Sequence, residues 1–314
     1  MFFLAYAIFF IIIFFLSLYI LWRIKFKKEP IKTVEILTYH KISDDFDWGI
    51  TRQKVSQFKK GIRFLHDIGY KSVPLEEIFR PKETFDRKVV ITFDDGYEDV
   101  YLNAFPILQK YGFTAFIFII TGYVGKSNSW DFNFGRKRKR HLSWKQIKEM
   151  SEFGFGFGSH TVNHPDLTKI DPACGGVEYE LKKSKEVLED KLGKEVIFLS
   201  YPFGRYNRFV QEEAERLGYK RAYTLAPKSK EDGFQSRLWR DFQPFAVERS
   251  GIYLFDSPLT LKIKLSRSAI GGSAFGGNRL FWMEDLKGRI INRFASGTSI
   301  LKGSPDYSGM IPNR

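Results

Sequence analysis

Strand-like and helix-like segments alternate along most of this chain, and that alternation limits the fold more than any other feature of the sequence. Short apolar runs of strand length are separated by longer segments with apolar residues at helical spacing, such as Val55, Phe58, Ile62 and Leu65. Parallel strands need crossovers that are usually helices, so this order predicts an α/β fold with a parallel sheet. The number of such units favours a (β/α) barrel over an open sheet. The expected strands are 33–40, 88–93, 114–121, 153–160, 196–202 and 220–225, and the expected helices are 51–69, 101–112, 143–154, 178–193 and 207–218.

The amino-terminal segment 1–22 contains no charged residue. A helix rises about 1.5 Å per residue, so this run is long enough to cross the roughly 30 Å hydrocarbon core of a bilayer. It lacks the basic start, the shorter apolar region and the small-x-small cleavage site of a secretory signal peptide. We therefore expect a retained, single-pass transmembrane helix over 1–22, followed by a basic linker over 23–32.

Positive charge follows this expected anchor and also dominates the whole chain. Arg23, Lys25, Lys27 and Lys28 flank the apolar run, and the positive-inside rule places such a flank in the cytoplasm. The net charge of +14 suggests an anionic surface nearby, such as membrane phospholipid or an acidic glycan. No nucleic-acid-binding motif accompanies the charge, so nucleic acid is not an expected partner. The basic run 135–141 is interpreted as a solvated loop, or as a contact for phospholipid headgroups or a lipid-phosphate-linked substrate.

The last part of the chain differs in composition from the domain expected over 33–255. Within 256–314, the segment 259–268 alternates apolar and polar residues like an edge or surface strand, and 271–278 resembles a linker. This extension is predicted to be peripheral and partly disordered. The single cysteine, Cys174, excludes a disulfide within the chain and a two-cysteine metal site.

Polar residues follow several of the expected strands at the point where each strand ends. His40 closes the first strand, Asp94 and Asp95 follow 88–93, and His160 and His164 follow the next strand but one. In α/β barrels the carboxyl ends of the strands meet at one rim, where the active site is built from the loops. These side chains are therefore expected to converge on one site.

The two histidines His160 and His164 and one of the two aspartates could hold a metal ion. Four residues apart on a helical turn, the imidazoles would lie on one side, and two histidines with one carboxylate form a common catalytic zinc set. Adjacent residues leaving a strand point in different directions, so one aspartate can face the ion while the other faces the water. One alternative is that the two histidines lie near each other on the surface by chance and bind no ion. For Asp94-Asp95-Gly96 the alternative is an ordinary turn after a strand.

Two further segments bear on the chemistry. His40 is either a second proton-transfer group or an ordinary histidine at a strand end. The turn 200–207 follows a strand, and the Phe203 amide within it is a candidate oxyanion donor.

Together these segments resemble the polysaccharide deacetylases of carbohydrate esterase family 4. The match consists of Thr-Phe-Asp-Asp-Gly-Tyr at 92–97, Ser-His-Thr-Val-Asn-His at 159–164, a reduced third motif Tyr-Pro-Phe-Gly at 201–204, and the approach segment 142–150. The resemblance covers about residues 33–255 and is greatest to the circularly permuted poly-N-acetylglucosamine deacetylases. It implies a distorted (β/α) barrel, a divalent metal such as zinc, and hydrolysis of N-acetyl groups on amino sugars.

The resemblance also implies residue roles. Asp94 would be the general base, while Asp95, His160 and His164 would hold the metal. The third motif implies oxyanion or substrate contacts for the Phe203 amide and for Tyr201. No histidine follows His164, so the late acid histidine of the family is absent, and the permuted subgroup makes His40 the candidate acid. The third motif also lacks its leading arginine, and Arg249 resembles a late arginine that would orient Asp94.

The resulting hypothesis is a metal-dependent N-deacetylase acting on a polysaccharide or a lipid-linked glycan at a membrane. Two alternatives are a catalytically silent, membrane-bound glycan-binding protein and an amidohydrolase of a small amide. The basic flank predicts a cytoplasmic domain, whereas the family resemblance favours the extracytoplasmic side.

Overall fold

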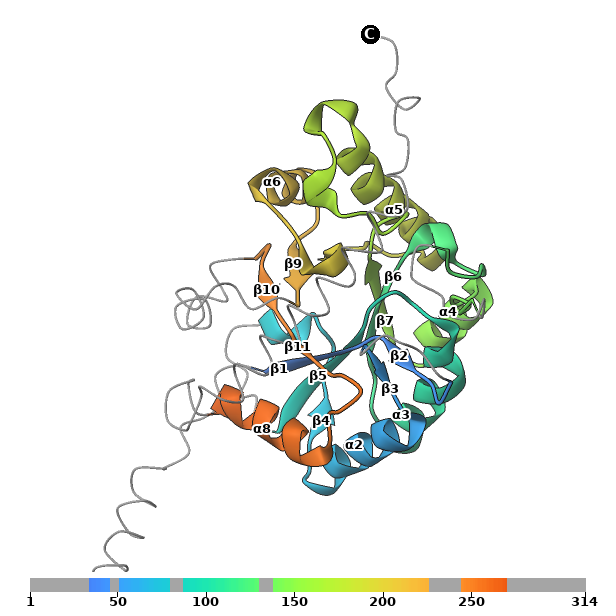
Figure 1. Ribbon diagram of the computed structural model, residues 1–314, viewed down its shortest axis with the longest axis vertical. Coiled ribbons are helices and arrows are strands. Elements are labelled where there is room, and N and C mark those ends of the chain that lie inside the picture. The colour runs from blue at the N-terminus through green and yellow to red at the C-terminus, as the bar shows by residue number, and fades with distance from the viewer. Residues whose placement is uncertain (1–33, 46–50, 80–86, 130–137, 226–243, 270–314) are drawn as a thin grey trace, which may run out of the picture.

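The computed structural model describes residues 34–45, 51–79, 87–129, 138–225 and 244–269, and its centre is a parallel β-sheet rolled into a nearly closed barrel (Figure 1). The hydrogen-bonded strand order is β10-β9-β8-β7-β6-β5-β1-β11, and β4 pairs with the start of β5. The strands are β1 (Glu35–Tyr39), β4 (Lys71–Ser72), β5 (Lys88–Phe93), β6 (Phe116–Ile119), β7 (Gly156–Ser159), β8 (Phe198–Ser200), β9 (Arg221–Thr224), β10 (Val247–Glu248) and β11 (Ser250–Gly251).

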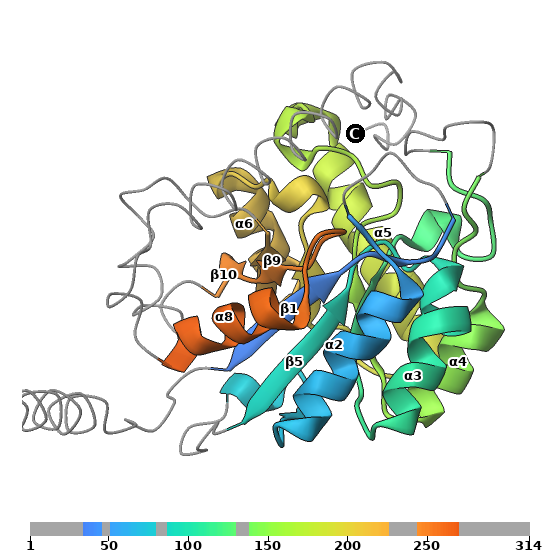
Figure 2. The same cartoon turned by 60° about the horizontal axis from the view of Figure 1, so that its bottom comes forward.

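Helices surround this sheet on the outside (Figures 1 and 2). Most of them follow the predicted ranges, and Ser143 caps the amino-terminal end of one of them, since its hydroxyl accepts from the Gln146 N–H. The helices are α2 (Val55–Asp67), a π-helical turn η2 (Val100–Ala104) that continues into α3 (Phe105–Lys110), α4 (Trp144–Glu152), α5 (Gly176–Leu192), α6 (Arg208–Arg216) and α8 (Pro258–Ala269). Short 3₁₀ turns are η1 (Glu77–Phe79), η3 (Thr121–Tyr123), η5 (Leu167–Lys169), η6 (Pro172–Cys174) and η7 (Pro202–Gly204), and a separate two-stranded sheet pairs β2 (Lys41–Ile42) with β3 (Arg52–Gln53).

Alternate residues of the strands face two different apolar cores. Leu37 and Ile91 belong to the larger core between sheet and helices, whereas Ile36 and Val90 belong to a smaller core inside the barrel. A side-chain period of two in strands produces this division. The inner core contains Val34, Ile36, Val73, Leu75, Val90, Phe116, Phe118, Phe198, Tyr223 and Val247.

Strand β7 supplies glycine to the barrel interior, which explains the Phe-Gly repeat of the sequence. A Cβ on Gly156 would lie 2.2 Å from the Phe116 ring, and one on Gly158 would lie 2.8 Å from both that ring and the Phe198 carbonyl. Aromatic side chains from β6 and β8 therefore fill the space that β7 leaves empty.

The barrel closes through one short segment. Strand β10 pairs with β9, with Val247 opposite Tyr223, and β11 pairs with β1, with Ser250 opposite Leu37. Only Arg249 separates β10 from β11. The chain thus crosses the seam of the barrel at Arg249, whose N–H donates to the Thr224 carbonyl at 3.1 Å.

The strand predicted over 259–268 is wrong, because this segment forms helix α8. Leu261, Lys264 and Leu265 are buried, which is the i, i+3, i+4 spacing of a helix face. Short apolar patterns fit either period, and Pro258 at the first helical position is the start signal that favours the helix. Helix α8 lies beside α2, so this part of the predicted peripheral extension is packed on the body (Figure 2).

Among the described residues, no helix combines the length and the apolar character needed to span a bilayer. The predicted anchor 1–22, the linker 23–32 and residues 270–314 lie outside the described residues.

A buried ion pair holds α8 against the seam. Lys264 Nζ lies 3.0 Å from Asp256 Oδ2 and donates to the Gly251 carbonyl at 2.6 Å, while Asp256 Oδ2 also accepts from the Tyr253 N–H at 2.7 Å. Both charged side chains are almost fully buried.

Replacing Lys264→Met is expected to lower the free energy of unfolding by about 3–5 kcal/mol, because it leaves the Asp256 carboxylate buried without its cation. The double variant Lys264→Met/Asp256→Asn removes both charges and keeps an acceptor for the Tyr253 N–H, so it should recover part of that loss. Urea denaturation of the full-length chain measures both. A double variant that is less stable than Lys264→Met would contradict this account of the pair.

Candidate functional site

The strands deliver the predicted polar residues to one end of the barrel, their carboxyl end. His40 follows β1, Asp94 and Asp95 follow β5, and His160 follows β7. Inside the barrel, just below them, the hydroxyls of Thr38 and Thr92 hydrogen-bond to each other at 2.9 Å. The residues that sequence analysis placed at one rim are therefore brought together by the tertiary structure.

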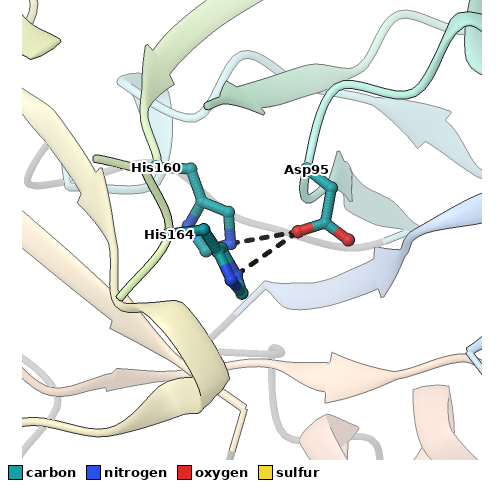
Figure 3. Close-up of side chains that lie close together, drawn as sticks. All are labelled: Asp95, His160 and His164. Atoms are coloured by element: carbon teal, nitrogen blue, oxygen red, sulfur yellow. Dashed lines mark ion pairs between the residues drawn. The ribbon is translucent and has the colours of Figure 1, made fainter. Parts of the chain in front are cut away.

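Asp95, His160 and His164 form a compact, buried group of possible metal ligands (Figure 3). Asp95 Oδ1 lies 3.4 Å from His160 Nε2 and 3.5 Å from His164 Nε2. Ligand atoms about 2.0–2.1 Å from a tetrahedral zinc ion are about 3.3 Å apart. The two distances from Asp95 thus match that spacing, and the ligand atoms of all three residues lie within 4.8 Å of one another.

A hydrogen bond orients the His160 ring as a possible metal ligand. Its Nδ1 donates to the Ser200 carbonyl at 2.7 Å, which leaves the lone pair on Nε2, the atom that faces Asp95. Two imidazole nitrogens and a carboxylate suit zinc and similar divalent ions. The residues present therefore fit the metal that the family resemblance implies.

The loop that carries the two histidines is not the helical turn predicted from their spacing. It is an irregular bend in which Thr161 and His164 adopt left-handed backbone angles, with φ of 69° and 59°. The two imidazole rings still meet, with centroids 4.7 Å apart. The spacing was informative about proximity, whereas the backbone conformation that produces it was predicted wrongly.

The ionisation of the three groups reflects their burial and their mutual contacts. Burial lowers the pKa of His164 to about 3, and the nearby His160 acts in the same direction. Burial would also lower the pKa of His160, but its hydrogen bond with Asp95 and the two aspartate charges outweigh burial and raise that pKa. Burial alone would raise the pKa of Asp95, yet the contacts with His160 and His164 hold it well below its usual range.

Asp94 faces a different partner, the buried guanidinium of Arg249. Arg249 Nη1 donates to Asp94 Oδ1 at 2.8 Å and Nη2 donates to Oδ2 at 2.7 Å, which is a bidentate pair. The Ser200 hydroxyl lies 3.2 Å from Asp94 Oδ2 and 2.7 Å from Arg249 Nη2. Burial would raise the pKa of Asp94, but the charges of Arg249 and His160 outweigh it and lower that pKa. Asp94 is thus kept as a carboxylate next to the possible metal ligand Asp95.

Comparison with known proteins identifies the family. The family described as polysaccharide deacetylase matches residues 82–222. The poly-beta-1,6-N-acetyl-D-glucosamine N-deacetylase of Staphylococcus epidermidis is 31% identical over 214 residues, which cover 65% of this chain and 70% of that protein. A Bacillus subtilis protein named as a polysaccharide deacetylase is 33% identical over 205 residues, 64% of this chain and 67% of that protein. The chain belongs to the polysaccharide deacetylase family.

Solved structures agree with this assignment. The Streptococcus pyogenes deacetylase PplD, in complex with acetate, superposes on the polysaccharide deacetylase described here with a TM-score of 0.60 at 30% identity, covering 74% of this chain and 97% of that one. IcaB from Ammonifex degensii has the same fold, with a TM-score of 0.59 at 22% identity over 77% of this chain and 97% of that one. The predicted family and the predicted deacetylase class are confirmed, as is the nearly closed parallel (β/α) barrel.

His40 lies beside the aspartates of the deacetylase site and is buried. Burial lowers the pKa of its imidazole, which the charges of Asp95 and Asp94 oppose. Its Nδ1 has no hydrogen-bond partner in the described part of the chain. The ring therefore sits at the site with one buried nitrogen for which the described residues supply no hydrogen-bond partner.

The third-motif turn contributes Phe203 but not the Tyr201 side chain. Phe203 has a left-handed backbone, with φ of 57°, and its ring packs edge-on against His164 with centroids 4.6 Å apart. Tyr201 is buried in the outer core, and its hydroxyl donates to the Phe245 carbonyl at 3.1 Å. This burial argues against the substrate contact predicted for Tyr201.

Two supporting residues escaped the sequence analysis. Ser200 contacts Asp94, Arg249 and His160, and it occupies the inward position two residues after Phe198, a pattern that could have identified it. His141 was interpreted as a loop residue, but it is buried and its Nδ1 donates to the Asp95 carbonyl at 2.9 Å. No periodic pattern in its neighbourhood signals that contact.

We expect zinc binding to release protons and to weaken as the pH falls. The imidazoles must be neutral to act as ligands, and the raised pKa of His160 means that the proton competes with the ion at higher pH than for an ordinary histidine. Calorimetric titration with Zn²⁺ in two buffers of different ionisation enthalpy measures the proton release.

Two variants test which residues are responsible. His164→Ala should lose binding, whereas His66→Ala, which removes an exposed histidine on α2, should retain it. Equal affinity in His164→Ala and the unsubstituted chain would rule out this group as the zinc site.

Proposed function

We propose that this polysaccharide deacetylase is a metal-dependent hydrolase that removes N-acetyl groups from the amino sugars of a glycan. The observation that carries the proposal is the pairing of two buried units. Asp95, His160 and His164 lie within 4.8 Å of one another as possible ligands, and the adjacent Asp94 is held as a carboxylate by Arg249. The first group is suited to binding a metal ion, and the Asp94 carboxylate next to it is suited to proton transfer.

The proposed roles follow from the chemistry of amide hydrolysis. A divalent ion bound by Asp95, His160 and His164 would polarise the acetyl carbonyl and make water more acidic. Asp94 takes up a proton from the attacking water as the general base. His40 donates a proton to the departing sugar amine, which is a poor leaving group until it is protonated. Atoms and charge balance as water adds across the amide bond to give acetate and a protonated amine, while the proton that Asp94 gains replaces the one that His40 gives up.

The Phe203 N–H is the proposed backbone donor to the oxygen of the tetrahedral intermediate. No acceptor among the described residues pairs with this N–H, and its turn is held by the Gly204 N–H, which donates to the Tyr201 carbonyl at 2.9 Å. A backbone donor fixed in a tight turn needs no rearrangement during the reaction.

An N-acetylated glycan is the proposed substrate. The name of the Staphylococcus epidermidis relative supports it, since that protein is a deacetylase of poly-beta-1,6-N-acetyl-D-glucosamine. A silent glycan-binding protein is disfavoured because both the base and the metal group are complete. A small amide substrate is the competing outcome, and a panel of N-acetylated sugars, oligomers and small amides separates the two by acetate release.

We further propose that the chain acts at a membrane through the uncharged segment 1–22. Its basic flank supports a cytoplasmic domain, and the deacetylase family favours the extracytoplasmic side. A reporter fused to the carboxyl terminus discriminates between these orientations.

Asp94→Asn should strongly slow acetate release while leaving zinc binding intact, because the amide cannot accept the water proton and Asp94 is not one of the proposed ligands. A loss of about 10²–10⁴-fold in rate is typical for removal of a general base. Zinc content and acetate release are measured on the same preparation. Activity near that of the unsubstituted chain would refute the role of Asp94, and absence of acetate release by the metal-loaded unsubstituted chain would refute the proposed function.

Arg249→Met should move the acidic limb of the kcat/KM profile to higher pH. The base works only when deprotonated, Arg249 lowers the pKa of Asp94, and its removal raises that pKa. Arg249→Lys keeps the charge without the bidentate geometry and should shift the limb less. The control is Arg140→Met, which removes one exposed positive charge that faces Glu98. An unmoved limb in Arg249→Met would show that Asp94 is not the group titrating there.

A further inference from the structure

The loop between the two histidines is held in an unusual backbone conformation. Thr161 and His164 both have left-handed φ values, which residues with a Cβ adopt only when their surroundings impose them. The positions of the His160 and His164 side chains depend on this backbone. Contacts that fix the loop therefore also fix the geometry of the proposed metal ligands.

A fully buried carboxylate on α5, Glu180, binds the middle of this loop. Glu180 Oε2 accepts from the Val162 N–H and the Asn163 N–H, each at 2.8 Å, and Oε1 accepts from the Asn163 side-chain amide at 2.7 Å. Hydrogen bonds to a carboxylate are short and strong in a buried setting. One side chain thus satisfies the two successive N–H groups midway between the ligands.

The carbonyl groups of the same loop are held from the opposite direction by η3. The Thr121 N–H donates to the Thr161 carbonyl at 3.1 Å, and the Gly122 N–H donates to the Val162 carbonyl at 2.9 Å. A Cβ on Gly122 would lie 2.5 Å from the Val162 oxygen, so the approach requires glycine. Backbone amides hold one edge of the loop, and among the described residues only Glu180 accepts from the N–H groups of Val162 and Asn163.

We infer that Glu180 is a positioning residue for the metal group: its carboxylate holds the backbone at 162 and 163 so that His160 and His164 present their Nε2 atoms to Asp95. This inference rests on the proposed function of that group as a metal site. Supporting residues of this kind typically alter metal affinity by about 10–100-fold.

Two substitutions at Glu180 separate the effect of the acceptor from the effect of folding. Glu180→Met fills similar space but offers no acceptor to the two N–H groups. Glu180→Gln keeps one oxygen for them, and the Asn163 amide can turn so that its oxygen faces the new amide group. The matched control is Leu188→Ala, a fully buried core residue about 12 Å further along the same helix, which lowers stability without touching the loop.

The first measurement is Zn²⁺ affinity of the full-length chain in detergent, by competition with a chelator. We expect the dissociation constant of Glu180→Met to rise at least about tenfold, and those of Glu180→Gln and Leu188→Ala to stay near that of the unsubstituted chain. The electronic spectrum of bound Co²⁺ should change in Glu180→Met alone. Unchanged affinity and spectrum in Glu180→Met, or an equal loss in Leu188→Ala, would overturn the inference.

The second measurement needs no metal, so it separates this inference from the proposed function. Amide hydrogen exchange at Val162 and Asn163 in the metal-free protein should be fastest in Glu180→Met and nearly unaffected in Leu188→Ala. If the unsubstituted chain bound no zinc, the proposed function would fail, while the exchange rates would still test whether Glu180 holds the loop. Unchanged exchange in Glu180→Met would show that it does not.

Discussion

The bidentate ion pair between Arg249 and Asp94 connects the closure of the barrel with the chemistry of its rim. Arg249 is the single residue between the strand that pairs with β9 and the strand that pairs with β1. Its guanidinium reaches Asp94 at 2.7–2.8 Å and lies over the rings of Phe118 and Tyr223. Removing one partner of a buried ion pair leaves an unpaired charge and is costly. Arg249 at the seam of the barrel and the Asp94 carboxylate therefore stabilise each other.

The interior of the barrel is layered, and the same strand parity supplies both its apolar core and its reactive rim. Along β5 the side chains that face the barrel interior are Val90 and Thr92, and Asp94 follows at the end of the strand. Along β1 the corresponding residues are Ile36 and Thr38, followed by His40. Apolar residues fill the lower layer, hydroxyls the middle one, and ionisable groups the upper one. The rim groups are thereby desolvated on the side facing the core, which is why burial shifts the pKa of so many of them.

Strand positions and the members of the site were accessible from sequence because they depend on local patterns. The range 88–93 was predicted as observed, and the polar residues that end the strands converge as parallel strands require. Local patterns failed where two periods fit equally, as in α8, and where tertiary contacts impose the backbone, as in the left-handed 161–164 loop. Tyr201 is a third case: its motif pointed to the site, but packing directs its ring into the core.

The sequence by itself determined the fold class, the family and the ionisable groups Asp94, Asp95, His160, His164 and His40, because periodicity and motif spacing are properties of the chain. The residue pattern alone left open which carboxylate faces the histidines, and the family resemblance implied Asp95; the tertiary structure has Asp95 beside the histidines and Asp94 against Arg249. It also decided that Ser200, His141 and Glu180 support them. Those choices depend on contacts between residues far apart in sequence, and the physical reason is burial: each polar group inside the barrel must find a partner, and only the folded chain supplies it.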